Sequence, residues 1–156
     1  MSAAAAGDSV GLTQTQTVRL FTSGQPLRLE GGDALGPVDV AYETYGTLNA
    51  DASNAVYLCH ALTGDAHAAG WHAGDRRPGW WDNLIGPGRP LDTNRFFVIC
   101  SNLLGGCQGT TGPGSVSPLT NAPYGMDFPL LDMADFVAVH RALLAHLGVT
   151  RLLVAL

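Results

Sequence analysis

Three short, almost continuously apolar segments constrain the fold of this chain more than any other feature. They lie at residues 55–59 (AVYLC), 95–100 (RFFVIC) and 151–156 (RLLVAL). Short apolar runs bounded by turn residues are typical of strands that are covered on both faces, and such strands occur mainly in parallel sheets with helices packed on them. The sequence therefore predicts an α/β fold with a mostly parallel sheet.

The remaining elements fit that fold. Residues 38–45 alternate apolar and polar side chains, which predicts a strand with one face in water, and residues 18–21 and 27–29 are expected to form two short strands. Asp132 can cap a helix whose apolar positions recur at helical spacing, and Gly148 can end it. This helix leads directly into the segment 151–156, as in a helix–strand unit of a parallel sheet.

Length and composition indicate one domain. The chain has 156 residues, of which 46% are hydrophobic and 13% charged, so it has enough apolar material for a buried core. Residues 1–16 are small and polar without periodicity and are expected to be a disordered tail. The single domain is then expected to span residues 17–156.

Charge and cysteine usage limit the partners and the compartment. Thirteen acidic residues against eight arginines give a net charge of −5, which argues against nucleic acid or a membrane as partner. Cys59, Cys100 and Cys107 lack CxxC spacing and are expected to be buried, reduced thiols in a cytoplasmic protein. The N-terminal residues do not resemble a signal peptide, and no apolar run approaches the ~18 residues needed to span a bilayer.

Two long loops point to a functional site. Residues 61–81 and 102–131 each begin where a predicted buried strand ends, and most connections in a compact domain are only ~4–6 residues long. Ligands of open α/β sheets bind at the carboxyl ends of the strands. We therefore expect these two loops to form the binding site.

The first loop has a composition that suits oxyanion binding. Residues 59–67 (CHALTGDAH) leave a strand and turn at Gly64, so backbone N–H groups can face a cleft and stabilise an oxyanion during acyl transfer. An ordinary glycine turn is the alternative. His60, His67 and His72, with Asp65 nearby, match no zinc-ligand spacing, so no metal site is expected. We expect His60 to be structural, and His67 and His72 to lie near the surface.

The second loop and the tryptophan pair carry weaker signals. Residues 105–113 (GGCQGTTGP) match no phosphate-loop pattern and are expected to form a tight loop beneath a pocket. No base for Cys107 as a nucleophile can be identified from the sequence. Trp80 and Trp81 are expected to pack their loop onto the core, or else to form a pocket wall.

Four segments together resemble one known family. Residues 59–67, 78–102, 103–113 and 124–137 occur in this order in homoserine O-acetyltransferases, the α/β-hydrolase-fold acyltransferases of methionine biosynthesis. The resemblance implies transfer of acetyl from acetyl-CoA to the hydroxyl of L-homoserine through an acyl-serine intermediate. It also implies acetyl-CoA as co-substrate with no bound cofactor, a cytoplasmic location, and a homodimer in the full-length parent.

The resemblance also assigns site residues. It implies that the backbone amide of Leu62 belongs to the oxyanion hole, with Ala61, Thr63 and Gly64 as pocket residues. The family continues after a strand like 151–156 with a Gly-Gly-Ser-x-Gly-Gly turn, so the serine, aspartate and histidine of the triad are expected beyond Leu156. The chain then corresponds to the N-terminal part of an α/β-hydrolase domain, truncated before the nucleophile elbow. By itself it is expected to be inactive and marginally stable, because strand 151–156 would be an unpaired edge.

Several alternatives stay open at this point. Similar chains use succinyl-CoA or acylate serine, and the same fold hosts hydrolases. A non-catalytic interaction protein or pseudoenzyme on a partial hydrolase fold is a further alternative.

Overall fold

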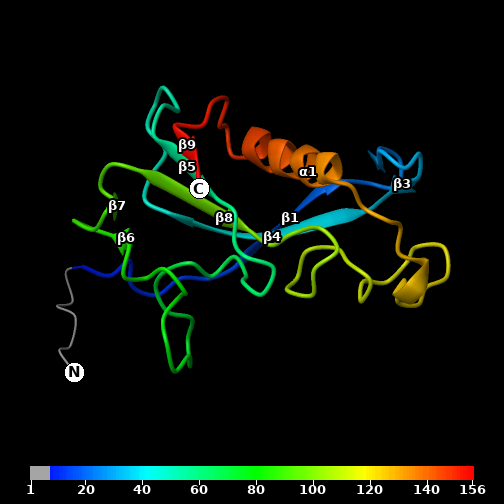
Figure 1. Cartoon of the computed structure of the whole chain (residues 1–156), viewed down its shortest axis with the longest axis horizontal. Helices are drawn as coiled ribbons and strands as arrows, with labels where there is room; N and C mark the ends of the chain where they lie inside the picture. Colours follow the sequence, from blue (N-terminus) through cyan, green and yellow to red (C-terminus); the bar gives the residue numbers. More distant parts are fainter. Residues whose placement is uncertain (1–7) are drawn as a thin grey trace. The chain divides into compact units, whose positions relative to one another are not determined.

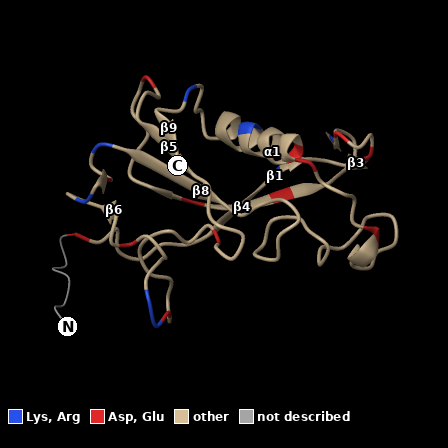
Figure 2. Ribbon diagram, in the orientation of Figure 1, with Lys and Arg blue, Asp and Glu red and all other residues tan. Residues whose placement is uncertain are grey.

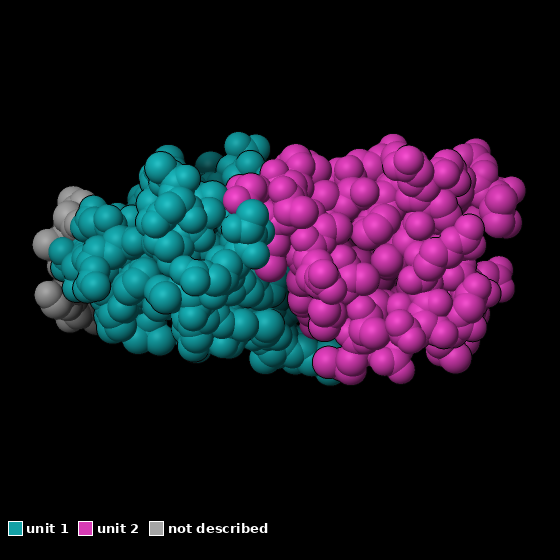
Figure 3. All heavy atoms as spheres, turned by 90° about the horizontal axis from the view of Figure 1, so that it is seen from above, with its two compact units in different colours: residues 1–16, 42–101, 149–156 teal, residues 17–41, 102–148 magenta. Residues whose placement is uncertain are grey.

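The computed structural model of the chain describes residues 8–156, which form two compact units (Figure 3). Unit 1 contains residues 42–101 and 149–156 together with the segment that ends at Gln16. Unit 2 contains residues 17–41 and 102–148. Strand β4 (Val38–Tyr45) contributes its first half to unit 2 and its second half to unit 1.

The sheet of unit 1 is built on three parallel strands. β5 (Ala55–Leu58) lies between β8 (Phe97–Ser101) and β9 (Val154–Ala155) and runs parallel to both (Figure 1). On the far side of β8, the second half of β4 pairs antiparallel, with Tyr42 opposite Ser101. The prediction that the three apolar segments form parallel strands is confirmed. The third strand, however, is only two residues long and both of its residues are exposed, so the expectation that it is covered on both faces is wrong.

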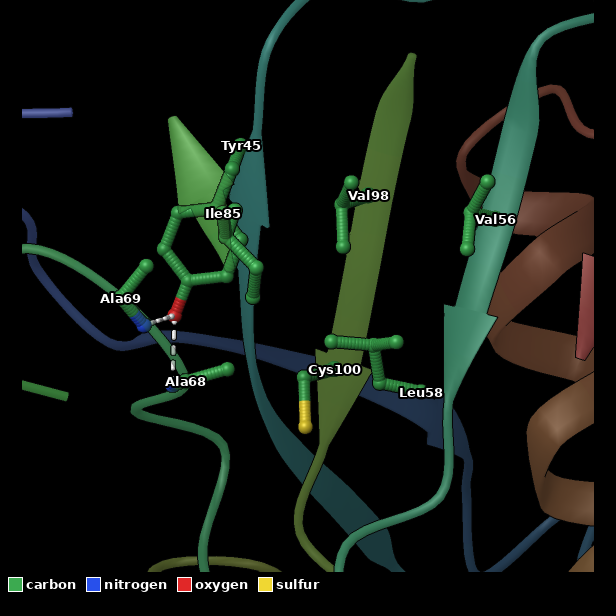
Figure 4. Packing of buried hydrophobic residues seen from close by; sticks show 8 residues of the cluster. All are labelled: Tyr45, Val56, Leu58, Ala68, Ala69, Ile85, Val98 and Cys100. Carbon is green, nitrogen blue, oxygen red and sulfur yellow. Dashed lines mark hydrogen bonds between the residues drawn. The ribbon is translucent and has the colours of Figure 1, made fainter. Parts of the chain in front are cut away.

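Apolar side chains on one face of β5 and β8 form the core of this unit. Figure 4 shows eight of its buried residues: Tyr45, Val56, Leu58, Ala68, Ala69, Ile85, Val98 and Cys100. The Tyr45 hydroxyl accepts hydrogen bonds from the N–H groups of Ala68 (2.8 Å) and Ala69 (3.1 Å). The core therefore also fixes the backbone of the long loop after β5, because two of its amides are bonded to a buried side chain.

The strand at 38–45 does not have one face in water, contrary to the expectation from its alternating pattern. Six of its eight residues are buried, and Glu43 is only 1% exposed. A buried carboxylate persists only when it is hydrogen-bonded, and Glu43 accepts bonds from four side chains. The polar residues of this strand thus belong to an internal hydrogen-bond network and do not form a solvent-exposed face.

Short segments complete unit 1. β6 (Ile85–Gly86) and β7 (Leu91–Asp92) pair in parallel within the long connection that leads to β8. Residues 1–7 of the expected tail lie outside the described residues. Further along, the Thr13 N–H donates to the Trp71 carbonyl (2.9 Å), and the Trp71 N–H donates to that of Gly11 (3.0 Å). Backbone hydrogen bonds thus hold this segment before β1 (Gln16–Phe21) begins.

Unit 2 contains β1 beside the first half of β4, and a single α-helix. β2 (Leu27–Arg28) pairs antiparallel with β3 (Ala34–Leu35), and a short 3₁₀ turn, η1 (Gly125–Asp127), precedes α1 (Met133–His146). The predicted helix is confirmed: Asp132 is its N-cap, and Gly148 adopts φ +75° after its end.

Two further observations bear on the expected partners. Basic residues occur in short, separated stretches along the chain, as the blue segments of Figure 2 show. Among the helices of residues 8–156, none has the length and apolar character needed to cross a membrane.

Candidate active site

The loop that follows β5 presents a backbone amide without an acceptor. A turn closes on the hydrogen bond from the Gly64 N–H to the Ala61 carbonyl (2.8 Å), which puts Leu62 at the first of its two central positions. The Leu62 N–H has no acceptor among residues 8–156, and the Leu62 side chain is 92% exposed. A Cβ added to Gly64 would lie 3.1 Å from the His60 Cβ, so the close packing of this turn favours glycine.

His60 orients the same turn from its N-terminal side. Its Nδ1 lies 2.7 Å from the Ala61 carbonyl oxygen. Since that oxygen can only accept, Nδ1 carries the proton. The Nε2 atom is buried and has no hydrogen-bond partner among the described residues. These contacts agree with the structural role expected for His60.

The end of β9 lies directly against the start of this loop. The Leu156 N–H donates to the Tyr57 carbonyl (2.9 Å), and the Cys59 N–H donates to the Leu156 carbonyl (2.7 Å). β5 and β9 are parallel, so their carboxyl ends share one edge of the sheet. This is the edge at which ligands of open α/β sheets bind.

A cavity of about 1010 Å³ opens beside this loop within unit 1. Ala61, Thr63 and Gly64, the pocket candidates from the sequence, all line it. Residues 75–81 line it as well, together with His67 and His72. The wall combines small residues, two aromatic rings and charged side chains, a mixture typical of ligand pockets.

Trp80 and Trp81 combine both roles considered for them. Their ring centroids are 5.0 Å apart, and Trp81 packs against the buried core of unit 1. Trp80 donates its indole N–H to the Asp65 carbonyl (2.9 Å), which ties the two ends of the long loop together. Both tryptophans also line the cavity.

Glu43 is the buried charge behind this wall. Its Oε1 accepts from Thr15 (2.9 Å) and His72 (2.7 Å), and its Oε2 accepts from Tyr45 (2.9 Å) and His67 (3.1 Å). Burial alone would raise the pKa of Glu43, but the hydrogen bonds, that of His67 foremost, outweigh it and hold the pKa below its ordinary value. Glu43 is therefore a carboxylate anion that joins three segments of unit 1.

His67 and His72 lie deeper than the sequence suggested. Their rings stack with centroids 3.8 Å apart, and their side chains are 13% and 32% exposed. Both rings contact Glu43, which is why they turn inward. Sequence reasoning missed Glu43 because it considered only the spacing of the histidines. The available signal was a glutamate between two tyrosines in a strand that is otherwise mostly apolar.

The three cysteines are free, as expected, but only one is buried. Burial, with added repulsion from Asp65 and Glu43, raises the pKa of the Cys100 thiol to about 12, so this thiol stays protonated. Cys59 and Cys107 are exposed, contrary to the expectation of buried thiols. Cys59 follows the last residue of β5 and is therefore outside the covered part of the strand.

The glycine-rich loop of unit 2 closes on itself. The Gly105 N–H donates to the Thr111 carbonyl (2.8 Å), and the Asn102 side-chain amide donates to the Gln108 carbonyl. A Cβ on Gly112 would lie 2.2 Å from the Gly106 carbonyl oxygen, so the close packing requires glycine there. The loop is as tight as predicted, and it does not line the cavity described above.

The chain matches curated proteins over nearly its whole length. It is 62% identical over 144 residues to a homoserine O-succinyltransferase of Nocardioides sp. (strain ATCC BAA-499 / JS614), covering 92% of this chain and 39% of that protein. It is 56% identical over 144 residues to a homoserine O-acetyltransferase of Methanohalophilus mahii, covering 92% of this chain and 29% of that protein. The chain thus spans less than half the length of these relatives. No protein-family model matches it.

Solved structures share this fold. The homoserine O-acetyltransferase from Bacillus anthracis superposes with a TM-score of 0.83 at 37% identity, covering 92% of this chain and 39% of that one. Esterase E22 gives a TM-score of 0.81 at 38% identity, covering 92% of this chain and 40% of that one. The fold is that of the N-terminal part of an α/β-hydrolase domain, as the sequence predicted.

Proposed function

We propose that the whole protein transfers an acyl group from acyl-CoA to the hydroxyl of L-homoserine. The premise is that the chain, over the part that it spans, belongs to the homoserine O-acyltransferase family. The sequence favoured acetyl-CoA as donor. Relatives of this chain carry both acetyl- and succinyltransferase names, so both donors belong in the test.

The observation that carries this proposal is the Leu62 amide. Attack on the thioester carbonyl of acyl-CoA places negative charge on its oxygen, and a backbone N–H that is not engaged elsewhere can stabilise that charge. The Leu62 N–H lacks an acceptor among the described residues, and its neighbours Ala61 and Thr63 line the cavity. Losing one such donor typically costs ~3–4 kcal/mol of transition-state stabilisation.

The position of Leu156 supports a nucleophile from the chain that follows β9. Leu156 is hydrogen-bonded to Cys59, three residues before Leu62. A serine on a sharp turn just after β9 would therefore stand beside the proposed oxyanion donor. In this proposal, the serine and its histidine–aspartate pair come from residues outside the 156, and the acyl-serine they form passes its acyl group to homoserine.

The proposal is tested on the complete translation product of the gene. Release of the CoA thiol is followed from acetyl-CoA and, separately, from succinyl-CoA, with and without L-homoserine. We expect release that depends on homoserine and formation of the O-acyl amino acid with one of the two donors. Absence of O-acylhomoserine with both donors, in a folded complete product, would contradict the proposal.

A hydrolase is the second candidate, and it is favoured by the likeness to esterase E22. The same oxyanion donor serves ester hydrolysis when water takes the place of homoserine as acceptor. In that case ester cleavage would proceed at the same rate with and without homoserine. Comparing the rate with and without homoserine therefore distinguishes the two candidates.

A further inference from the structure

The cluster of Glu43, His67 and His72 contains more than a buried ion-pair network. Glu43 accepts from His67 Nδ1 (3.1 Å) and from His72 Nε2 (2.7 Å), so the carboxylate fixes the proton on these two atoms. The lone pairs of the neutral rings are then on the opposite atoms, His67 Nε2 and His72 Nδ1. A carboxylate that fixes the tautomer of a histidine in this way is the usual companion of a metal-binding imidazole.

Both lone-pair nitrogens face one further carboxylate. Asp75 Oδ2 lies 3.8 Å from His67 Nε2 and 3.7 Å from His72 Nδ1. These distances are too long for hydrogen bonds, and His67 Nε2 is buried without a partner among the described residues. Ligand atoms of a tetrahedral zinc site with ~2.1 Å bonds lie ~3.4 Å apart, and the two distances from Asp75 Oδ2 are only slightly longer.

We propose that His67 Nε2, His72 Nδ1 and Asp75 Oδ2 form a binding site for a divalent transition metal of the zinc type, with Glu43 as the carboxylate that orients both histidines. The proposal does not depend on the proposed acyl transfer. Two imidazoles and one carboxylate favour Zn²⁺ or Co²⁺ over Mg²⁺ or Ca²⁺, which prefer oxygen ligands.

The distances also decide the role of Glu43. Its carboxylate oxygens lie within 4.8 Å of ligand atoms of both histidines, so it could be considered as a ligand itself. Its four contacts, however, are 2.7–3.1 Å long, which are hydrogen-bond lengths, and each of its oxygens already accepts two of them. Glu43 therefore acts on the metal through the two rings.

The site has access to solvent and room to adjust. The Asp75 side chain is 40% exposed, so water can fill a fourth position and a metal can enter from that side. The two rings are less exposed, His72 at 32% and His67 at 13%, so Asp75 is the ligand with the most room to move as the site closes on the ion. All three ligands lie on the cavity wall, so a bound ion would brace the segment that carries Trp80 and Trp81.

The test is a titration of the complete gene product with Co²⁺ and Zn²⁺, after treatment with a chelator. We expect one ion per chain, and with Co²⁺ a visible absorption spectrum of a tetrahedral nitrogen–oxygen site. His72→Ala and Asp75→Asn, both at partly exposed positions, should each weaken binding at least 10-fold. Glu43→Gln should weaken it by ~10–100-fold, as loss of an orienting carboxylate does.

Two controls keep the outcome decisive. His146→Asn alters an exposed histidine at the end of α1 and should leave the affinity unchanged. Cys59→Ser combined with Cys107→Ser removes the exposed thiols, which are rival ligands, and should also leave it unchanged. Circular dichroism checks that each variant is folded. Failure of the parent protein to bind either ion in a 1:1 ratio would overturn the proposal, as would binding that survives His72→Ala or is lost only with the cysteines.

Discussion

The backbone N–H of Cys59 donates to the carbonyl oxygen of Leu156 at 2.7 Å. This bond joins the first residue after β5 to the first residue after β9. It puts the loop that carries the Leu62 amide at the carboxyl edge of two parallel strands, where open α/β sheets bind their ligands. The proposed acyl transfer depends on this placement, because it brings the loop of the proposed oxyanion donor next to Leu156.

Gly79→Ala is expected to destabilise unit 1 by about 1–3 kcal/mol or more, because overpacking forces the backbone to shift. The new Cβ would lie 2.3 Å from the Ala69 nitrogen and 2.4 Å from the Ala68 carbonyl carbon. Gly114→Ala is the matched control, since a Cβ there meets nothing within 4 Å. Urea unfolding of both variants checks the prediction. Equal stabilities would show that the packing of residues 75–81 on the core is looser than the structure has it.

Glu43→Gln should lower the free energy of unfolding at neutral pH by about 1.5–3 kcal/mol, the range for hydrogen bonds to a charged group. Glu43 is 1% exposed, and both of its oxygens are engaged by other side chains. Glu30→Gln, at an exposed position, is the control and should change little. A Glu43→Gln variant as stable as the parent would show that the network contributes nothing to stability.

The same residue gives a signed pH dependence. Burial raises the pKa of Glu43, but its hydrogen bonds outweigh this effect and lower the pKa in the folded state below the ordinary value of 4.5. Its stabilisation is therefore complete above about pH 4.5 and is lost as the pH falls toward the folded-state pKa. Denaturation at a series of pH values from 6 to about 3 should show a steeper loss for the parent than for Glu43→Gln. Parallel curves would contradict the assignment.

Asp82→Ala should cost about 2–4 kcal/mol, because it removes the carboxylate partner of the mostly buried Arg89 and leaves the Gly70 amide without its acceptor. Asp82 accepts from the Gly70 N–H (2.9 Å) and from Arg89 (3.0 Å). Asp82→Asn keeps an acceptor for the amide and should cost less. Thermal melting of the two variants ranks them. Equal costs would mean that the charge of Asp82, which both variants lose, decides the effect and not its bond to the Gly70 amide.

In unit 2, Asp135→Ala should destabilise the helix more than Asp132→Ala does. Asp135 is 2% exposed and accepts from the N–H groups of Asp132 (2.7 Å) and Glu30 (3.0 Å). Its loss leaves two amides without an acceptor, which should lower the free energy of unfolding by about 2 kcal/mol. Asp132 caps one amide, that of Ala134, at about 1 kcal/mol. Hydrogen exchange along α1 distinguishes the two. The opposite order would make Asp132 the principal cap.

Local signals in the sequence were enough to place β4, β5, β8 and α1, whereas the two-residue strands β3, β6 and β7 were not predicted. The apolar runs at 55–59 and 95–100 are buried strands because both of their faces are covered, and Asp132 and Gly148 mark the helix ends through local backbone chemistry. The turn at Leu62 was predicted from Gly64 and from the resemblance to homoserine O-acetyltransferases. These features depend on neighbours close in the chain.

The cluster around Glu43 could not be predicted in the same way. Glu43 lies in β4, whereas His67 and His72 are on the loop after β5, and only the fold brings them together. Alternation in β4 suggested a wet face, because a buried carboxylate and an exposed one look alike in sequence. Their difference lies in the four hydrogen bonds, which come from segments distant in the chain.

The most direct measurement compares Leu62→Pro with Leu62→Ala in the complete gene product. Proline suits the first central position of a turn and Leu62 does not have a positive φ, so the turn can form without the N–H. Alanine keeps the amide. We predict that Leu62→Pro lowers kcat for homoserine acylation by ~10²–10³-fold, whereas Leu62→Ala stays within a few-fold of the parent. Equal activity of the two folded variants would contradict an oxyanion role for the Leu62 amide.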